Sequence, residues 1–243
     1  ADLVIIGRSP KSSFYMGADA QVWHDSITTP VILNAPYIAT SGSERINWFE
    51  MSSAYHANEE PELAYAIVDP ANEIFNLVDI PTGDSIPWMY APHDLLTVND
   101  TSTNGTIAAR YGDEDLLVVQ NAAGTAIYKD GPTPVGPRTY FGFGNDAGGW
   151  DNFFPLSDEA QQVYLNEINR LLGNTLVEAV TIEPTLKPPS VILIEADARE
   201  PYQIDFLETQ GYDVTVMEPF NFSQVTGADT FDILNNADLV IIG

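Results

Sequence analysis

The sequence contains no cysteine among its 243 residues. This absence excludes disulfides, thiolate metal sites and a cysteine nucleophile. It leaves the compartment undetermined, because secreted proteins also avoid reactive thiols. Long apolar runs are missing as well: none approaches the roughly 20 residues that cross a bilayer. We therefore expect no membrane span.

Basic residues are scarce. Nine Lys and Arg face 35 Asp and Glu, which gives a formal net charge of −26. Such a field repels phosphate backbones, so we expect no nucleic-acid partner. It suits divalent cations and a solvated outer surface. The hydrophobic share of 44% is that of a globular protein with a substantial core.

Signals of catalysis are also few. The three histidines, His24, His56 and His93, lack the spacing of a zinc site. No Gly-x-Ser-x-Gly motif provides a serine nucleophile, and the glycines between residues 7 and 17 do not form a nucleotide-binding loop.

One seven-residue segment occurs twice. Ala-Asp-Leu-Val-Ile-Ile-Gly begins at Ala1 and again at Ala237, 236 positions apart. Its β-branched run ending in glycine is typical of a strand buried on both faces of a parallel sheet, and a chain rarely starts inside such a strand. We therefore interpret the chain as one period, plus a seven-residue overlap, of a tandem-repeat protein. An engineered circular permutant and a cloning artefact are the alternatives.

The duplicated segment predicts a role in assembly. Only one copy is expected to be central in the sheet, while the other leaves it or enters a neighbouring unit. The assembly residues are Leu3, Val4, Ile5 and Ile6 in the first copy and Leu239, Val240, Ile241 and Ile242 in the second.

Read cyclically from the prolines at 188–189, the chain alternates strands and helices. Residues 190–195 and 212–217 read as strands around a helix at 201–210; a short helix at 230–236 precedes the duplicated strand, and a helix at 18–26 precedes a strand at 30–34. This alternation predicts a doubly wound, mostly parallel sheet in circularly permuted register.

The segment from 64 to 140 has a different character. Short alternating runs between Pro and Gly turns, at 64–67, 74–78, 106–109, 116–119 and 126–128, predict an antiparallel extension of the sheet. Residues 138–143 read as a strand and 155–172 as the clearest helix, with Ser157 as its N-cap and Gly173 at its end. We expect one domain from 1–173 joined with 190–243, and an inter-repeat linker at 174–189.

The order of these strands resembles the flavodoxin-like core of class I glutamine amidotransferase-like domains, and within them the trehalose-utilisation-type modules. The resemblance rests on the strands at 190–194 and 211–216, on the duplicated segment, and on Arg-Thr-Tyr-Phe-Gly-Phe at 138–143, followed by Trp-Asp-Asn at 150–152 and the helix start at 156–160. It covers roughly 190–243 joined to 1–173.

The resemblance implies a cysteine nucleophile after the fourth strand. The corresponding corner here is Asn34, Ala35 and Pro36, which we interpret as a degenerate nucleophile corner. Because the attacking thiolate is missing, glutaminase chemistry is excluded. We predict that the chain is not an enzyme and that it holds no cofactor.

Two kinds of loop residue carry weaker predictions. Asp146, Asp151 and Asn152 offer oxygen ligands of the kind that calcium prefers. Asn99, Asn104 and Asn221 begin Asn-x-Ser/Thr sequons, which accept N-glycans in secreted proteins.

Three functions remain open on the sequence. The first is a structural repeat unit of an extracellular filament, sheath or surface layer, whose partner is itself and whose linker pairs as a strand through Val177 and Val180. The second is a carbohydrate-binding module of a large secreted protein, with Tyr37 and Trp48 at the ligand edge. A hydrolase related to the trehalose-utilisation group is ranked last.

Overall fold

The computed structural model describes residues 1–7, 10–40, 45–50, 55–57, 65–81, 83–89, 94–99, 102–145, 156–174, 190–194, 208–209, 213–217 and 239–242. Its described strands form one sheet of thirteen strands. One half of this sheet is parallel and the other is antiparallel. The expectation of an α/β protein with an antiparallel extension is confirmed at this level.

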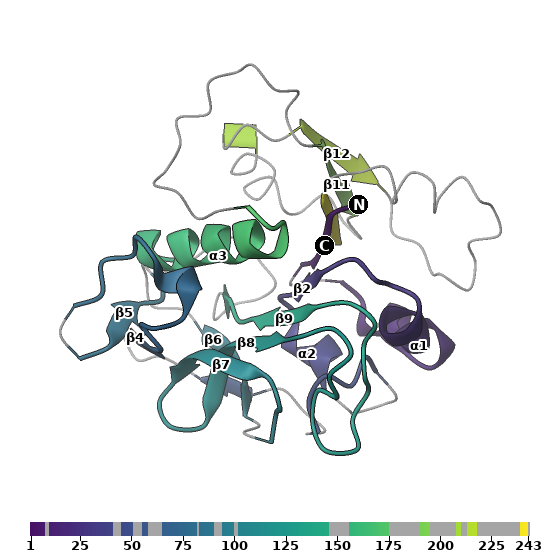
Figure 1. The fold of residues 1–243 in the computed structure, drawn as a ribbon, viewed down its shortest axis with the longest axis horizontal. Helices are drawn as coiled ribbons and strands as arrows, with labels where there is room; N and C mark the ends of the chain where they lie inside the picture. The colour runs from purple at the N-terminus through teal and green to yellow at the C-terminus, as the bar shows by residue number, and fades with distance from the viewer. Residues whose placement is uncertain are drawn as a thin grey trace.

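The parallel half contains six neighbouring strands, and each pairs in parallel with the next. Their spatial order is β12 (Asp213–Met217), β11 (Ser190–Ile194), β13 (Leu239–Ile242), β1 (Leu3–Ile6), β2 (Val31–Leu33) and β9 (Arg138–Phe141). Most are rich in Val, Ile and Leu, the composition that a parallel strand with both faces covered requires. Strands β12, β11, β2 and β9 of this half are labelled in Figure 1.

The two copies of the duplicated segment both lie in this sheet, side by side. Strand β1 pairs with β13 in register, from Leu3 opposite Leu239 to Ile6 opposite Ile242. The expectation that only one copy could be central is therefore wrong. Each copy has a different second neighbour, β2 for β1 and β11 for β13, so the sheet contains a position for both.

The antiparallel half continues from β9 through β8 (Asp115–Asn121), β7 (Thr106–Tyr111), β4 (Tyr65–Val68) and β5 (Ser85–Pro87). A branch leaves β8 through β6 (Asp94–Asn99), which pairs with β3 (Tyr55–Ala57) and β10 (Gly144–Asn145). The strands expected around 106–109 and 116–119 are confirmed, as is that at 64–67 over its described residues.

Two other expected strands are wrong. The run at 74–78 begins inside a 3-10 helix, η3 (Glu73–Phe75), whose first turn is capped by the Asn72 side chain accepting from the Ile74 amide. At 126–128 only an isolated bridge between Thr103 and Tyr128 forms. Short apolar runs do not distinguish these structures by periodicity alone.

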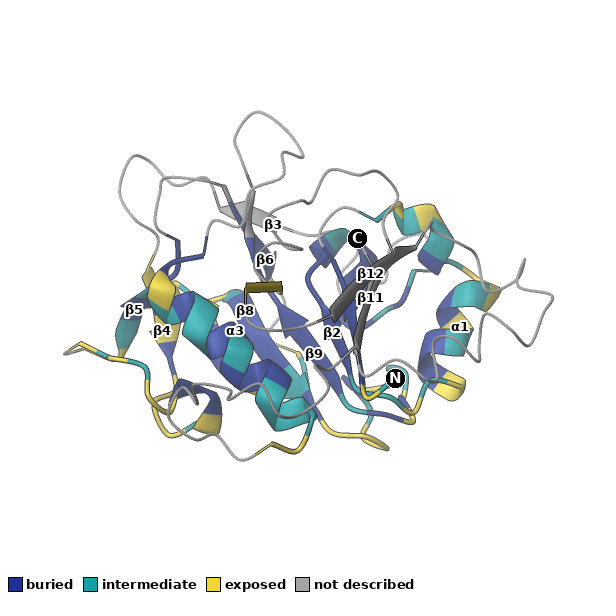
Figure 2. Ribbon diagram, turned by 90° about the horizontal axis from the view of Figure 1, so that it is seen from above, coloured by how far each residue is buried: buried dark blue, intermediate teal, exposed yellow. Residues whose placement is uncertain are grey.

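Helices cover both faces of the sheet (Figures 1 and 2). Helix α3 (Asp158–Leu171) lies on one face, while α1 (Ala18–Asp25), α2 (Pro36–Ala39) and the 3-10 helix η1 (Ser12–Tyr15) lie on the other. Ser157 caps α3 by accepting from the Ala160 amide at 3.1 Å, as expected. The prediction of a helix near 18–26 is confirmed as well.

Strand β1 contributes to the hydrophobic core on each face. Leu3 and Ile5 pack in the core under α3, whereas Val4 and Ile6 pack in the core under α1 and α2. This alternation follows from the two-residue period of a strand. It makes the sheet the middle of three layers.

Candidate functional site

The carboxyl edge of the parallel strands is where open α/β sheets place ligands, and the predicted corner lies there. Asn34 follows β2, and its amide donates to the Ile6 carbonyl of β1 at 2.9 Å. Its side chain is only 2% exposed. The Nδ2 group donates to the Tyr164 hydroxyl of α3 at 3.1 Å, whereas Oδ1 has no hydrogen-bond partner among the described residues.

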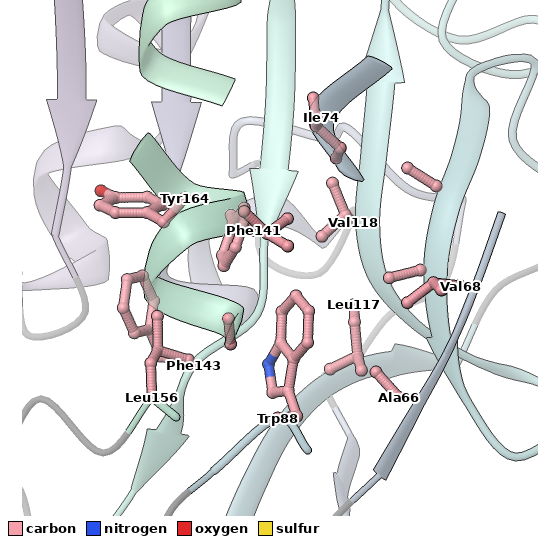
Figure 3. Close-up of a cluster of buried hydrophobic side chains, with 14 of the residues drawn as sticks. Ala66, Val68, Ile74, Trp88, Leu117, Val118, Phe141, Phe143, Leu156 and Tyr164 are labelled. Atoms are coloured by element: carbon pink, nitrogen blue, oxygen red, sulfur yellow. The ribbon is translucent and has the colours of Figure 1, made fainter. Parts of the chain in front are cut away.

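Aromatic rings hold Tyr164 in place beside this corner (Figure 3). Its ring meets Phe141 and Phe143 edge to face, with centroid separations of 4.8 Å and 5.2 Å. Such T-shaped contacts add about 0.5–1.5 kcal/mol each to area burial. The side-chain amide of Asn34 therefore donates its hydrogen bond to a phenol group that is held in a fixed position on the inner side of α3.

Ala35 and Pro36 begin a helix. Ala35 accepts from the amides of Ile38 and Ala39, and Pro36 occupies the first turn of α2, where its missing N–H leaves no bond unmade. Both residues are buried. The chemistry at this corner, among the described residues, is that of an amide and a phenol.

The two residues expected to bind sugar differ in exposure. Tyr37 is partly exposed, and its carbonyl accepts from Arg45 Nη1 at 2.6 Å. Trp48 is 0% exposed, and its backbone amide donates to the Ala39 carbonyl at 2.7 Å. The Trp48 ring is a core side chain and presents no face for stacking on a sugar, so the expected role of Trp48 is corrected.

A buried carboxylate fastens α3 to the sheet. Glu167 is 0% exposed and accepts four hydrogen bonds. Arg170 donates two of them, at 2.8 Å and 2.7 Å, and Thr139 of β9 and Gln120 of β8 donate the others. Burial by itself lowers the pKa of Arg170, but the hydrogen bonds and charge of Glu167 outweigh it and raise that pKa above its usual value.

This group is saturated, because each oxygen of Glu167 accepts twice. A carboxylate whose acceptor positions are all occupied in this way has a structural role, which is to hold α3 against the sheet. Sequence reasoning missed it. The available signal was a charged residue inside the apolar stripe of α3, between Tyr164 and Ile168.

A second buried charge joins α1 to the sheet. Arg138, at the start of β9, is 0% exposed and donates to four carbonyls. Burial lowers its pKa to about 10, so it remains charged at neutral pH. A guanidinium at the carboxyl end of a helix is favoured by the helix dipole. Its acceptors are the carbonyls of Trp23, Ile27, Thr29 and Pro137.

Only part of the chain that concerns the metal and histidine predictions is described by the structure. Among the described residues, no group of three or more His, Asp and Glu is arranged to hold a metal ion. The calcium candidates Asp146, Asp151 and Asn152 lie outside the described residues, as does His93. His24 is buried on α1, and burial lowers its pKa.

The structure describes only some of the residues in the glycosylation and linker predictions. Asn99 and Asn104 are exposed, and Asn104 Nδ2 donates to the Ala126 carbonyl at 2.9 Å. Three residues, Asn221, Val177 and Val180, fall outside the described part of the chain.

The fold and these contacts define an α/β protein whose mixed sheet is covered on both faces. Comparison of the chain with protein-family models, with curated proteins and with solved structures found no match. The helices that the structure describes are all too short or too polar to cross a membrane. The resemblance to amidotransferase-like modules stays a prediction.

Proposed function

We propose that this chain is one non-catalytic unit of a tandem-repeat structural protein, which forms an extracellular filament, sheath or surface layer. The observation that carries the proposal is the in-register pairing of two identical strands in the parallel half of the sheet. A chain built from such units in series is a quasi-one-dimensional object.

The strand order supports this proposal. We number the strands of the parallel half from 1 to 5 in their cyclic order along the chain, which is β11, β12, the duplicated strand, β2 and β9. The observed order β12-β11-β13-β1-β2-β9 then reads 2-1-3-3-4-5. Removing either copy of strand 3 leaves 2-1-3-4-5, the order of flavodoxin-like sheets. A flavodoxin-like unit in permuted register accounts for all six strands.

The registers support it as well. The valine of the duplicated strand has a neighbour in each copy: Val240 faces Ile192 of β11, and Val4 faces Val31 of β2. The next residue behaves in the same way, because Ile241 faces Leu193 and Ile5 faces Ile32. One Leu-Val-Ile-Ile strand satisfies both sets of neighbours without a register shift. In a longer repeat, one copy of this strand would thus fill position 3 of each domain, between β11 and β2.

The surface charge fits an exposed assembly. A net charge of −26 keeps such units solvated and limits lateral association. Residues 1–173 and 190–243 would form each domain, and residues 174–189 would connect one domain to the next.

The test is the intact mass of the protein in its source, followed by electron microscopy of the same material. The proposal expects a mass that is a multiple of the repeat and images with an axial repeat of some tens of ångströms, the size of one compact domain. A source species near 26.6 kDa that appears as discrete particles would contradict it.

A further inference from the structure

We propose that separate copies of this chain link head to tail by strand exchange, with β13 of one copy pairing in register with β1 of the next. The partner is a second copy of the chain, and the interface is the one that joins β13 to β1 within a copy. This inference rests on the proposed function, because both start from the in-register pairing of the two copies of the duplicated strand.

The topology divides the sheet at this pair. Strands β12, β11 and β13 form a three-stranded group, and within the described residues β13 is its only member that pairs with the rest of the sheet. Among the described strands, separating β13 from β1 therefore breaks a single strand pairing and leaves the pairings on either side intact.

The length of chain between the two groups permits the exchange. Fifteen residues, 175–189, follow α3 and precede β11. Fully extended, such a segment reaches up to about 50 Å. The three-stranded group of one copy can therefore reach the β1 edge of another.

Strand exchange replaces the internal contact by an equivalent one. The four facing pairs, from Leu3 with Leu239 to Ile6 with Ile242, are re-formed between copies with the same side chains. The free-energy difference is then mainly the entropy of association, which rising concentration offsets. This is the thermodynamic condition under which domain swapping occurs.

The pair also specifies its own register. Leu3 and Ile5 enter one core, whereas Val4 and Ile6 enter the other. A slip of one residue would send every side chain to the opposite face. Copies would therefore join through the same four residue pairs each time.

The absence of cysteine makes a direct test available. One full-length chain carries Val4→Cys, and a second, lengthened by an affinity tag, carries Val240→Cys. Facing residues on neighbouring strands lie about 4.8 Å apart, within disulfide range. The two chains are unfolded together, refolded at increasing concentration and oxidised. We expect a mixed disulfide-linked product of about twice 26.6 kDa, whose share rises with concentration.

The matched control replaces Val240→Cys by Ile242→Cys. That residue is offset by two positions from Val4, at roughly 8 Å, too far for a disulfide. We expect several-fold less mixed product in the control. A chain that carries both Val4→Cys and Val240→Cys should close on itself at low concentration.

Two results would overturn strand exchange: a mixed product no higher than that of the control, or a double variant that fails to close on itself. Oligomers without the disulfide would indicate edge-to-edge association and would also count against it. The proposed function fails on a different result, the source mass, so the two can be rejected separately.

Discussion

Replacing Glu167 by Gln tests the fastening of α3 to the sheet. The carboxylate accepts twice at each oxygen, from Arg170 on both sides, from Thr139 at Oε1 and from Gln120 at Oε2. A glutamine keeps one oxygen and turns an NH2 group toward two donors. In either orientation one hydrogen bond to the charged Arg170 is lost. An NH2 group in place of Oε2 also loses the bond from Gln120, whereas the Thr139 hydroxyl can turn to accept from an NH2 group in place of Oε1.

The expected loss follows from these contacts. A hydrogen bond to a charged group contributes about 1.5–3 kcal/mol, and breaking a buried ion pair costs about 3–5 kcal/mol. The Arg170 side chain is 26% exposed, so water recovers part of its interaction. We therefore expect Glu167→Gln to lower the free energy of unfolding by about 3 kcal/mol.

Urea unfolding followed by tryptophan fluorescence provides the measurement, since buried Trp88 packs against Phe141, next to Tyr164 of α3. Exposed Glu114 supplies the matched control, because Glu114→Gln should change stability by less than about 0.5 kcal/mol. In a double-mutant cycle, Glu167→Gln and Arg170→Met should be far from additive. A loss below about 1 kcal/mol, or additive effects, would refute the reasoning.

Three further predictions concern α1 and the segment that leads into β9. Arg138→Lys should lower the free energy of unfolding by at least about 2 kcal/mol, because a lysine cannot reach all four carbonyls; unchanged urea midpoints would contradict this. Gly136→Ala should destabilise by about 1–3 kcal/mol, because its Cβ would meet the Thr28 carbonyl, and a lower melting temperature checks this. The pKa of His24 is lowered by burial, so below its usual pKa of about 6.5 the unfolded chain binds the proton more readily. Stability from His24 is therefore present above about pH 6.5 and is lost as pH falls, and the stability difference between the wild type and His24→Gln should shrink between pH 7 and 5; a constant difference would refute it.

Much of the element pattern could be predicted because its signals are local. Helix α3 was expected over 155–172 and spans Asp158–Leu171, since an N-cap serine, an apolar stripe and a terminal glycine all lie within its own sequence. Strands of the parallel half were expected from continuous β-branched runs. The run at 74–78 failed because a short apolar segment is ambiguous without its neighbours.

The candidate site was predictable only in part. The position of Asn34 at the carboxyl edge follows from the end of a strand, but its bond to Tyr164 joins residues 130 positions apart. The burial of Trp48 depends likewise on what the rest of the chain packs over it. Neither contact has a local signal.

The sequence by itself determined the α/β class, the duplicated strand, the strong negative charge and the absence of thiol chemistry. Only the tertiary structure decided that both copies lie side by side, and that Arg138 and Glu167 are buried and bonded. The physical reason is that composition and helical or strand periodicity belong to short segments. The neighbours of a strand or of a buried charge are set by which distant segments together bury the most apolar surface and satisfy the most polar groups.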